Sequence, residues 1–362
     1  MLFKKIMLPK NFYIFLQILI IILLGTPFIC SASTYTKNTI IPILTYHKFC
    51  LGESPDDYTI NIDRFEQQLI FLKNNGYQAI TVSQLLNCID NGFFPEKPVL
   101  ITIDDGFKSA YTQAFPLLKK YQIPATFYLY VDFINNGPNQ LSWIEVEEMV
   151  KNGMEIGSHS ISHCNLLHIK TDETYPEYLE RIRREIFLSK SILERKTNSP
   201  VNSFAYPYGV YSEQIRDLAI EADYQVLLNV NSMNNSVSSI DQYNLNRYII
   251  AAECSLDLFK SILEEKPLEV KGIFPADGTV TDNQSTTIGV LLKNSNISPN
   301  NLNFRLSGSG LLDFDYSDQL QEISFTPVAP KLLQKRTWIA QISTYDREND
   351  VQKKYSWLFT IR

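Results

Sequence analysis

The sequence predicts an α/β domain with a parallel sheet covered by helices, followed by a smaller all-β domain. From Ile40 to Leu228, short apolar runs alternate with segments of helical periodicity, and so many units favour a barrel. After about Glu265 the helical periodicity disappears, and short alternating runs are separated by Asn, Ser, Gly and Pro clusters. The length of 362 residues exceeds the size at which one hydrophobic core usually stops growing, so two domains are expected.

The elements of the first domain are expected from two different patterns of apolar residues, one typical of strands and one typical of helices. Strands are expected where short apolar runs are rich in β-branched and aromatic residues, and helices where apolar residues recur every three to four positions. The expected strands cover residues 40–46, 99–103, 125–131, 154–156, 203–205 and 225–228. The expected helices cover residues 63–74, 83–90, 113–121, 143–151, 175–194 and 212–222.

The second domain is expected to be a sandwich. Runs such as 287–292 and 337–342 have the alternating pattern of strands, and they are separated by turn-forming residues. Roughly a hundred residues of such strands suit a β-sandwich of immunoglobulin type. We therefore place the first domain at 38–265 and the immunoglobulin-like domain at 267–362.

The first 33 residues differ from the rest of the chain. Three lysines near the start precede an apolar run from Phe12 to Leu24, and small residues follow at 30–33. This pattern indicates an export signal, although the apolar run could instead persist as a membrane anchor. In either case the rest of the protein is expected outside the cytoplasmic membrane: secreted, periplasmic, or anchored and facing outward.

The charge of the chain limits its possible partners, and its cysteine content bears on disulfide bonds. The net charge of −6 is spread along the chain without a basic tract, so no nucleic-acid partner is expected. Four cysteines lie beyond the predicted signal, with no CxxC pair. Disulfides are conceivable in an oxidising compartment, but the spacing favours buried free thiols.

Two of the four histidines in the chain, His159 and His163, are separated by four positions. They follow directly after the expected strand near 154–156. If the segment turns helically, this spacing lets both imidazoles face one metal ion, and imidazole suits zinc-like ions. The pair is a candidate metal site, although a single His at such a position is more often structural.

Two adjacent carboxylates, Asp104 and Asp105, follow the apolar strand at 99–103. In barrels the carboxyl ends of the strands are where active sites collect. One carboxylate could bind a metal while the other moves protons. The alternative is a simple turn, since Asp-Gly pairs are common at turns and Gly106 follows.

The third candidate motif is the run Tyr206-Pro207-Tyr208-Gly209 after the short strand at 203–205. A Pro-aromatic-Gly turn fixes the backbone and can direct an N–H towards a developing oxyanion. Taken alone, the run is equally consistent with a tight turn.

Together and in this order, the three motifs resemble the polysaccharide deacetylases of the NodB-homology type, carbohydrate esterase family 4. The pattern of that family is TFDDG, then H(S/T)xxH, then a PYG-type turn. Here the first motif reads Thr-Ile-Asp-Asp-Gly over 102–106, the second matches fully, and the third keeps the Pro-Tyr-Gly. The resemblance covers about 40–265. The opening run Pro-Ile-Leu-Thr-Tyr-His over 42–47 is most similar to the poly-N-acetylglucosamine deacetylase branch.

The resemblance implies a distorted (β/α)7 barrel and a role for each motif residue. Asp105, His159 and His163 would bind a divalent metal, most simply Zn²⁺, with Co²⁺ or Ni²⁺ as alternatives. Such a metal would polarise the acyl oxygen and lower the pKa of a water molecule. Asp104 would be the general base, and the backbone N–H of Tyr208 would help to hold the oxyanion.

The sequence departs from the family pattern at two points. The family usually has an Arg just before the PYG turn that pairs with the base, and Ala205 stands in that position. Arg247 is a candidate replacement. The late Leu-x-x-His motif that often provides the general acid is also absent, because no histidine follows His168. His47 ends the opening strand and is a candidate for a catalytic role at the same barrel mouth.

The expected function is removal of N-acetyl groups from N-acetylglucosamine-containing polysaccharide. Pro207, Tyr208 and Trp143 are the candidate substrate-binding residues, Trp143 as a surface on which a sugar could stack. Two alternatives stay open: an O-acetyl esterase of the xylan type, and a carbohydrate-binding protein with a vestigial metal site. The C-terminal domain carries no recognisable binding motif and is expected to be a spacer or an accessory module that contacts glycan or protein.

Overall fold

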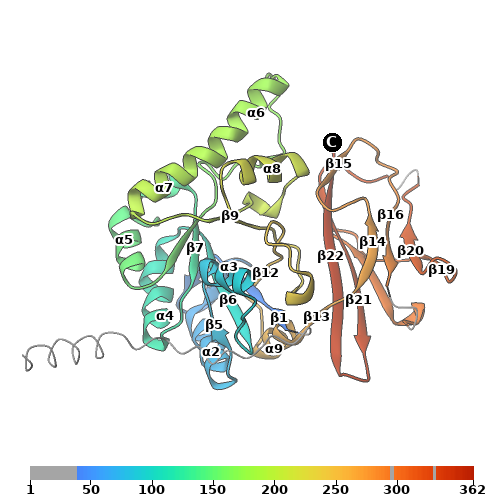
Figure 1. Ribbon diagram of the computed structural model, residues 1–362, viewed down its shortest axis with the longest axis horizontal. Helices are drawn as coiled ribbons and strands as arrows, with labels where there is room; N and C mark the ends of the chain where they lie inside the picture. Colours follow the sequence, from blue (N-terminus) through green and yellow to red (C-terminus); the bar gives the residue numbers. More distant parts are fainter. Residues whose placement is uncertain (1–38, 294–296, 329–331) are drawn as a thin grey trace, which may run out of the picture.

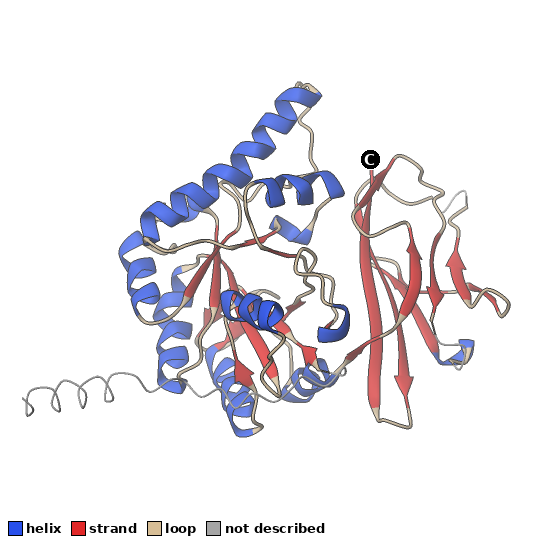
Figure 2. Ribbon diagram, viewed as in Figure 1, coloured by secondary structure: helices blue, strands red, loops and turns tan. Residues whose placement is uncertain are grey.

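The computed structural model describes residues 39–293, 297–328 and 332–362. The predicted export signal or anchor over 1–33 lies outside these residues. Within the described part of the chain, no helix combines the length and the apolar character needed to cross a bilayer. Figure 1 shows two bodies side by side, one with helices around strands and the other formed by strands, as the colouring of Figure 2 makes plain.

The first domain is built on a parallel sheet. Seven of its strands follow one another in the spatial order β10-β9-β8-β7-β6-β2-β12, each parallel to its neighbours, and a further strand, β5, pairs with β6. Their bounds are β2 Ile43–Tyr46, β5 Gln78–Ala79, β6 Pro98–Asp105, β7 Thr126–Leu129, β8 Glu155–Ser158, β9 Ser203–Ala205, β10 Val226–Leu228 and β12 Tyr248–Ile249. Because the neighbours are parallel, their carboxyl ends lie along one edge of the sheet.

The two ends of this strand order approach each other. Leu228 of β10 forms an isolated parallel bridge with Leu245, which lies three residues before the start of β12. The backbone N–H of Leu245 donates to the carbonyl of Leu227, and that of Asn229 donates to the carbonyl of Leu245, each at 2.9 Å. The sheet therefore curves until its last strand reaches the segment that leads into β12.

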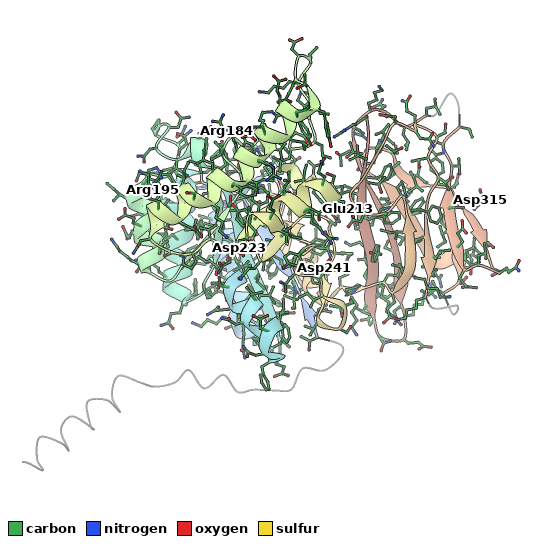
Figure 3. The ribbon with its side chains drawn as sticks, turned by 45° about the horizontal axis from the view of Figure 1, so that its top comes forward. Arg184, Arg195, Glu213, Asp223, Asp241 and Asp315 are labelled. Atoms are coloured by element: carbon green, nitrogen blue, oxygen red, sulfur yellow. The ribbon has the colours of Figure 1, made fainter. Side chains whose placement is uncertain are left out.

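Helices cover the sheet (Figure 2). They are α2 Ile62–Asn74, α3 Val82–Asn91, α4 Phe115–Tyr121, α5 Trp143–Lys151, α6 Tyr175–Arg183, α7 Ser189–Thr197, α8 Glu213–Glu221 and α9 Leu256–Glu264. The π-helical segment η3, Arg184–Leu188, joins α6 to α7 and makes one long helix of 175–197. Arg184 and Arg195, labelled in Figure 3, are exposed residues of this long helix, whose inner face packs on the domain core.

The starts of three helices are fixed by residues that local sequence specifies. Thr81, Ser142 and Thr174 each form a capping box with the Gln or Glu three residues later. Such a box satisfies two backbone N–H groups that the first turn leaves without a partner. This local chemistry is the reason that the expected helix boundaries near 83, 143 and 175 fall within a residue of the observed ones.

The structure departs from the expected elements in several places, and among the additions are two short paired strands, β3 Lys48–Cys50 and β4 Thr59–Asn61. The strand expected over 40–46 is divided at Pro42 into β1, Ile40–Ile41, and β2, and β1 pairs with β11, Asn235–Ser236, instead of joining the parallel sheet. Strands β5 and β12 have two residues each and were not expected, and neither was α9. The thiols of Cys50, Cys164 and Cys254 are free, as predicted, and that of Cys254 is buried.

The second domain is formed by two sheets. One has the order β13-β22-β21-β17-β18 with β15 also paired to β22, and the other has the order β14-β16-β20-β19. The bounds are β13 Lys266–Pro267, β14 Val270–Phe274, β15 Thr279–Thr281, β16 Ile288–Leu292, β17 Leu302–Leu306, β18 Gly310–Leu312, β19 Asp315–Ser317, β20 Glu322–Phe325, β21 Thr337–Asp346 and β22 Val351–Ile361. The expectation of an α/β domain followed by an all-β domain is thus confirmed.

The two sheets share one apolar core. Val290 of β16 and Ile323 of β20 lie in the same buried cluster as Phe304 of β17 and Trp357 of β22. Two sheets that enclose one core form a sandwich. The sheets of an immunoglobulin domain are antiparallel. Here β13 and β15 both pair parallel to β22, so the immunoglobulin topology itself stays a prediction.

Strand β22 also carries much of the contact between the two domains. Leu358 belongs to the buried core cluster of the first domain, and Ile339 of β21 packs against that cluster. A polar contact lies within the same interface: the ammonium group of Lys354 is 2.8 Å from Glu265, which also accepts a hydrogen bond from the Tyr248 hydroxyl. Both Lys354 and Glu265 are buried.

This pair gives a prediction about stability. Lys354→Met is expected to lower the free energy of unfolding by about 3 kcal/mol, because it leaves the buried Glu265 without its counter-charge. Lys353→Met is the matched control, since the neighbouring Lys353 pairs with Asp346 in a partly exposed position and should cost under about 1 kcal/mol. Urea unfolding of both variants measures the difference, and equal losses would contradict the prediction.

Candidate metal and catalytic site

The candidate site lies at the carboxyl edge of the parallel sheet. Asp104 and Asp105 end β6, and His159 follows directly after the last residue of β8. Successive residues of a strand normally point to opposite faces. Asp105 has a left-handed backbone (φ 76°), which ends the alternation, and both carboxylates lie near His159: the Nε2 atom is 3.9 Å from Asp104 Oδ2 and 3.8 Å from Asp105 Oδ1.

Three side chains converge with the geometry of a metal-binding site. The candidate ligand atoms of Asp105, His159 and His163 all lie within 4.8 Å of one another. His163 Nε2 is 3.4 Å from Asp105 Oδ1 and 3.1 Å from His159 Nε2. Asp105 Oδ1 is buried and forms no hydrogen bond within the described part of the chain. A buried acceptor that faces two imidazole nitrogens fits a bound cation.

The electrostatics of the two imidazoles suit the same interpretation. His159 Nδ1 is 2.7 Å from the Ala205 carbonyl, so the Nδ1–H donates there and Nε2 keeps its lone pair towards His163. Burial lowers the pKa of His159 to about 3 and also lowers the pKa of His163. Both rings are therefore neutral near pH 7, which is the form that binds metal.

The His159–His163 segment reaches this geometry without a helix. The expectation of a helical turn is wrong, because residues 159–163 form a loop in which Ser160 and His163 both have a left-handed backbone. The carboxylate of Glu185, from the long helix, accepts the N–H groups of Ile161 and Ser162 at 2.9 Å each and the Ser162 hydroxyl at 2.7 Å. The loop is thus held by a side chain that the motif does not contain.

The two adjacent carboxylates differ in their electrostatics. Burial acts to raise the pKa of Asp104, but the charge of Arg247 and its hydrogen bond to the carboxylate oppose burial, and the pKa is lowered. Burial and the negative charge of Asp104 raise the pKa of Asp105 to about 7. Such a separation of two neighbouring carboxyl groups is typical of paired catalytic roles.

Arg247 lies beside Asp104 although it is far away in the sequence. Its Nη1 atom is 2.8 Å from Asp104 Oδ1, and both side chains are almost completely buried. Arg247 directly precedes β12, and its side chain runs past Thr102 on the inside of the sheet to reach Asp104. The carbonyl of Asn229 accepts its Nε–H at 3.0 Å. Asp104 thus has an arginine partner, but this arginine comes from another part of the chain than position 205, where the family pattern has its Arg.

Three other candidate residues from the sequence are His47, Tyr208 and Trp143. His47 lies close enough to Asp104, Arg247 and His163 for their charges to act on it. Burial lowers its pKa, and its Nδ1 atom is buried without a hydrogen bond within the described residues.

The Tyr208 ring lies 4.6 Å from the His163 ring, and this residue is 63% exposed. Trp143 starts α5, and its indole lies beside the Lys196 ammonium group of α7. A sugar-stacking role for Trp143 stays a prediction.

The turn after β9 holds an unusual backbone. Pro207 is buried, and Tyr208 has a left-handed backbone (φ 59°) that a bulky residue rarely adopts. Gly209 follows with φ 69°, and a Cβ atom there would lie 2.1 Å from the Val230 side chain. Only glycine fits this position, so the turn is held between β9 and the segment after β10.

Sequence reasoning did not identify several of the residues around the site. Glu185 belongs to a charged helix, where a carboxylate carries no distinguishing signal. Tyr130 packs on the His163 ring at 5.2 Å, and burial together with Asp105 raises its pKa to about 12. Asn229 acts through its backbone carbonyl, a group that every residue has. Only the fold brings these groups to the ligands.

The support that Glu185 gives to the loop leads to a prediction about metal affinity. Glu185→Ala is expected to weaken Zn²⁺ binding by roughly 10- to 100-fold, since the loop that carries both histidines loses its three hydrogen bonds. Calorimetric titration of chelator-stripped protein with Zn²⁺ measures the effect. Glu221→Ala, which removes an exposed pair with Arg183 elsewhere on the surface, is the control. Equal affinities for the two variants would show that Glu185 does not support the site.

Comparison with known proteins shows what the first domain is similar to. The family model for polysaccharide deacetylase matches residues 91–227. YxkH of Bacillus subtilis strain 168 is 29% identical over 231 residues, which are 63% of this chain and 77% of that protein. Poly-β-1,6-N-acetyl-D-glucosamine N-deacetylase of Staphylococcus aureus strain MRSA252 is 26% identical over 170 residues; these are 46% of this chain, and the match spans 59% of the length of that relative.

Solved structures agree with this match. The deacetylase PplD of Streptococcus pyogenes in complex with acetate superposes with a TM-score of 0.57 at 26% identity, over 63% of this chain and 99% of that one. The polysaccharide deacetylase BC0361 of Bacillus cereus gives a TM-score of 0.55 at 26% identity, over 63% of this chain and 70% of that one. The first domain of this chain is therefore similar to polysaccharide deacetylases in sequence and in fold.

Proposed function

We propose that the protein is a metal-dependent hydrolase that removes N-acetyl groups from polysaccharide containing N-acetylglucosamine and releases acetate. One observation carries the proposal: a buried carboxylate with a lowered pKa, Asp104, lies directly beside a three-residue metal-binding geometry. A pure binding site has no need of such a base. The relative from Staphylococcus aureus, named for N-deacetylation of an N-acetylglucosamine polymer, supports the choice of an amide substrate.

Asp105, His159 and His163 would hold the cation, and Zn²⁺ suits this set of one carboxylate and two imidazoles, with Co²⁺ or Ni²⁺ as alternatives. When bound, a divalent cation would polarise the acyl oxygen and make a water molecule more acidic. Asp104 accepts the proton of the attacking water, since Arg247 keeps its carboxylate ionised. The Tyr208 backbone N–H stabilises the oxyanion.

Breakdown of the tetrahedral intermediate requires a proton on the leaving nitrogen. The proton that Asp104 accepts is available for this step. His47 lies within electrostatic reach of Asp104 and has an unbonded, buried ring nitrogen, so we propose it as the group that passes this proton onward. This assignment would fill the role that the missing late histidine leaves open.

For the substrate we propose that the exposed ring of Tyr208, with Pro207 beneath it in the same turn, contacts the sugar next to the ligands. We further propose that the first domain, 38–265, is a distorted (β/α)7 barrel, which the bridge between Leu228 and Leu245 supports. An immunoglobulin-type second domain over 267–362, and export or anchoring through 1–33 to a place outside the cytoplasmic membrane, complete the proposal.

The activity itself is tested by acetate release from N-acetylglucosamine oligomers and from acetylated xylan, with protein as prepared, after chelation, and after addition of Zn²⁺, Co²⁺ or Ni²⁺. We expect chelator-sensitive release from the amino-sugar oligomers. Asp104→Asn should lower kcat by roughly 100- to 10,000-fold, because it removes the base and leaves the ligands in place. Release from xylan alone would reassign the protein as an O-acetyl esterase. Tight glycan binding without release would indicate a vestigial site.

The contact between Arg247 and Asp104 gives a separate prediction. Arg247→Met is expected to lower kcat about 100-fold with little change in KM, since Asp104 loses both its counter-charge and its fixed orientation. Arg216→Met, at a partly exposed arginine 3.9 Å from Asp241, is the control and should leave kcat unchanged. An unchanged kcat in Arg247→Met would exclude Arg247 from the catalytic machinery.

A further inference from the structure

Asp277 belongs to the second domain, yet its carboxylate accepts hydrogen bonds from side chains of the first domain. It lies in the turn between β14 and β15, where Oδ1 accepts the backbone N–H of Leu358 at 2.9 Å. Its other oxygen, Oδ2, accepts the side-chain amides of Asn244 at 3.0 Å and Asn231 at 3.4 Å. Both asparagines come from the segment between β10 and β12, which faces β22 (Figure 1).

The turn that carries Asp277 is fitted closely to the first domain. Gly278 has a left-handed backbone (φ 77°), and a Cβ atom at this position would lie 3.0 Å from the Tyr211 ring. The Gly278 N–H donates to the Leu358 carbonyl at 2.9 Å, so β22 holds the turn from its other side. The position of the Asp277 carboxylate is thus fixed by both domains.

From Asp277 a chain of hydrogen bonds leads to the catalytic base. Asn244 Oδ1 accepts a side-chain N–H of Asn229 at 2.7 Å and the Tyr211 hydroxyl at 2.8 Å. Asn229 is fully buried, and its backbone carbonyl accepts the Arg247 Nε–H at 3.0 Å. Arg247 Nη1 then donates to Asp104 at 2.8 Å. Each link between residues is a hydrogen bond between two side chains or between a side chain and a backbone carbonyl, and within Asn229 the side chain and the carbonyl are joined covalently.

The chain has a physical consequence for Arg247. Its Nη2 atom is buried without a hydrogen bond within the described residues, so the guanidinium is oriented by its hydrogen bonds at Nε and Nη1 and by the Tyr128 ring, whose centroid is 5.3 Å from Cζ. The Nε partner, Asn229, starts a segment that has no helix or strand until β11. Asn229 is held there by the bond from its backbone N–H to the Leu245 carbonyl and by its side-chain amide, which donates to Asn244 at 2.7 Å and to Asn246 at 3.2 Å. Asn244 thus supplies one of the contacts that keep the Asn229 carbonyl in place.

We propose that Asp277 is a positioning residue which the second domain supplies to the active site: through Asn244 and Asn229 it sets the orientation of Arg247 and therefore of the Asp104 carboxylate. The inference rests on the proposed deacetylase function for its kinetic consequence, and on the hydrogen bonds alone for its structural one. It gives the second domain a role in catalysis beyond that of a spacer or a glycan-binding module.

The identity of the residue is central to the test. Asp277 accepts hydrogen bonds at both oxygens, whereas an Asn there offers one acceptor and must turn its NH₂ group towards a donor. Asp277→Asn should therefore lower kcat roughly tenfold with little change in KM, measured as acetate release from N-acetylglucosamine oligomers. In the exchange variant Asp277→Asn/Asn244→Asp, the new Asn can donate to the new Asp while its oxygen still accepts the Leu358 N–H. We expect this variant to recover most of the lost kcat.

Two controls separate positioning from loosening of the interface. Ile339→Ala truncates an apolar contact between the same two domains but keeps the backbone pairing of this position with Leu358 and every hydrogen-bonding side chain of the chain, so it should lower the melting temperature without lowering kcat. The Arg247 Nε–H resonance in ¹⁵N NMR spectra, assigned by its loss in Arg247→Met, should exchange faster with solvent in Asp277→Asn and return to wild-type protection in the exchange variant.

The outcomes distinguish this inference from the proposed function. An active wild type with unchanged kcat and unchanged Nε–H protection in Asp277→Asn overturns the inference and leaves the function intact. Equal losses of kcat in Asp277→Asn and Ile339→Ala, without recovery in the exchange variant, also overturn it. If the wild type releases no acetate, the proposed function fails, and the protection of the Arg247 Nε–H decides the inference by itself.

Discussion

The buried ion pair between Arg247 and Asp104 is the interaction on which the site depends. Asp104 and Asp105 are adjacent in the chain, and burial favours the protonated form of each. Two neighbouring carboxylates in such a place cannot both stay ionised without a counter-charge. Because Arg247 is paired with Asp104, the Asp104 carboxylate stays ionised, and Asp105, with a pKa raised to about 7, is left as the group that a cation would hold ionised.

The site also requires left-handed backbone conformations, which residues other than glycine rarely adopt. Asp105, Ser160, His163 and Tyr208 all have positive φ angles. Each such non-glycine residue costs roughly 1–2 kcal/mol, so the surrounding structure must hold it in place. At the histidine loop this support comes from Glu185 and from the Ser160 hydroxyl, which accepts the His163 N–H at 3.0 Å. The candidate ligands thus converge because neighbouring elements stabilise a loop that would not adopt this conformation alone.

The second domain extends this support beyond the parallel sheet. Its strand β22 packs Leu358 into the core of the first domain, and its turn at Asp277 reaches the irregular segment between β10 and β12. That segment lies where the curved sheet closes on itself and has little regular structure of its own. A sandwich packed against it provides rigid partners for polar groups that the first domain leaves without any.

Much of the fold and of the candidate site could be predicted from the sequence, because the patterns that indicate them lie within short segments of the chain. Apolar periodicity placed most helices and strands, and the motif spacing singled out Asp104, Asp105, His159 and His163, which the fold brings together. Two-residue strands such as β5 and β12 carry too little pattern to be recognised, and the loop conformation of 159–163 depends on Glu185. Arg247 could only be a candidate, because its contact with Asp104 spans 143 positions. Which distant side chain reaches the base, and how the second domain holds it, is decided by tertiary packing, since no local pattern records a contact between segments that meet only in the folded chain.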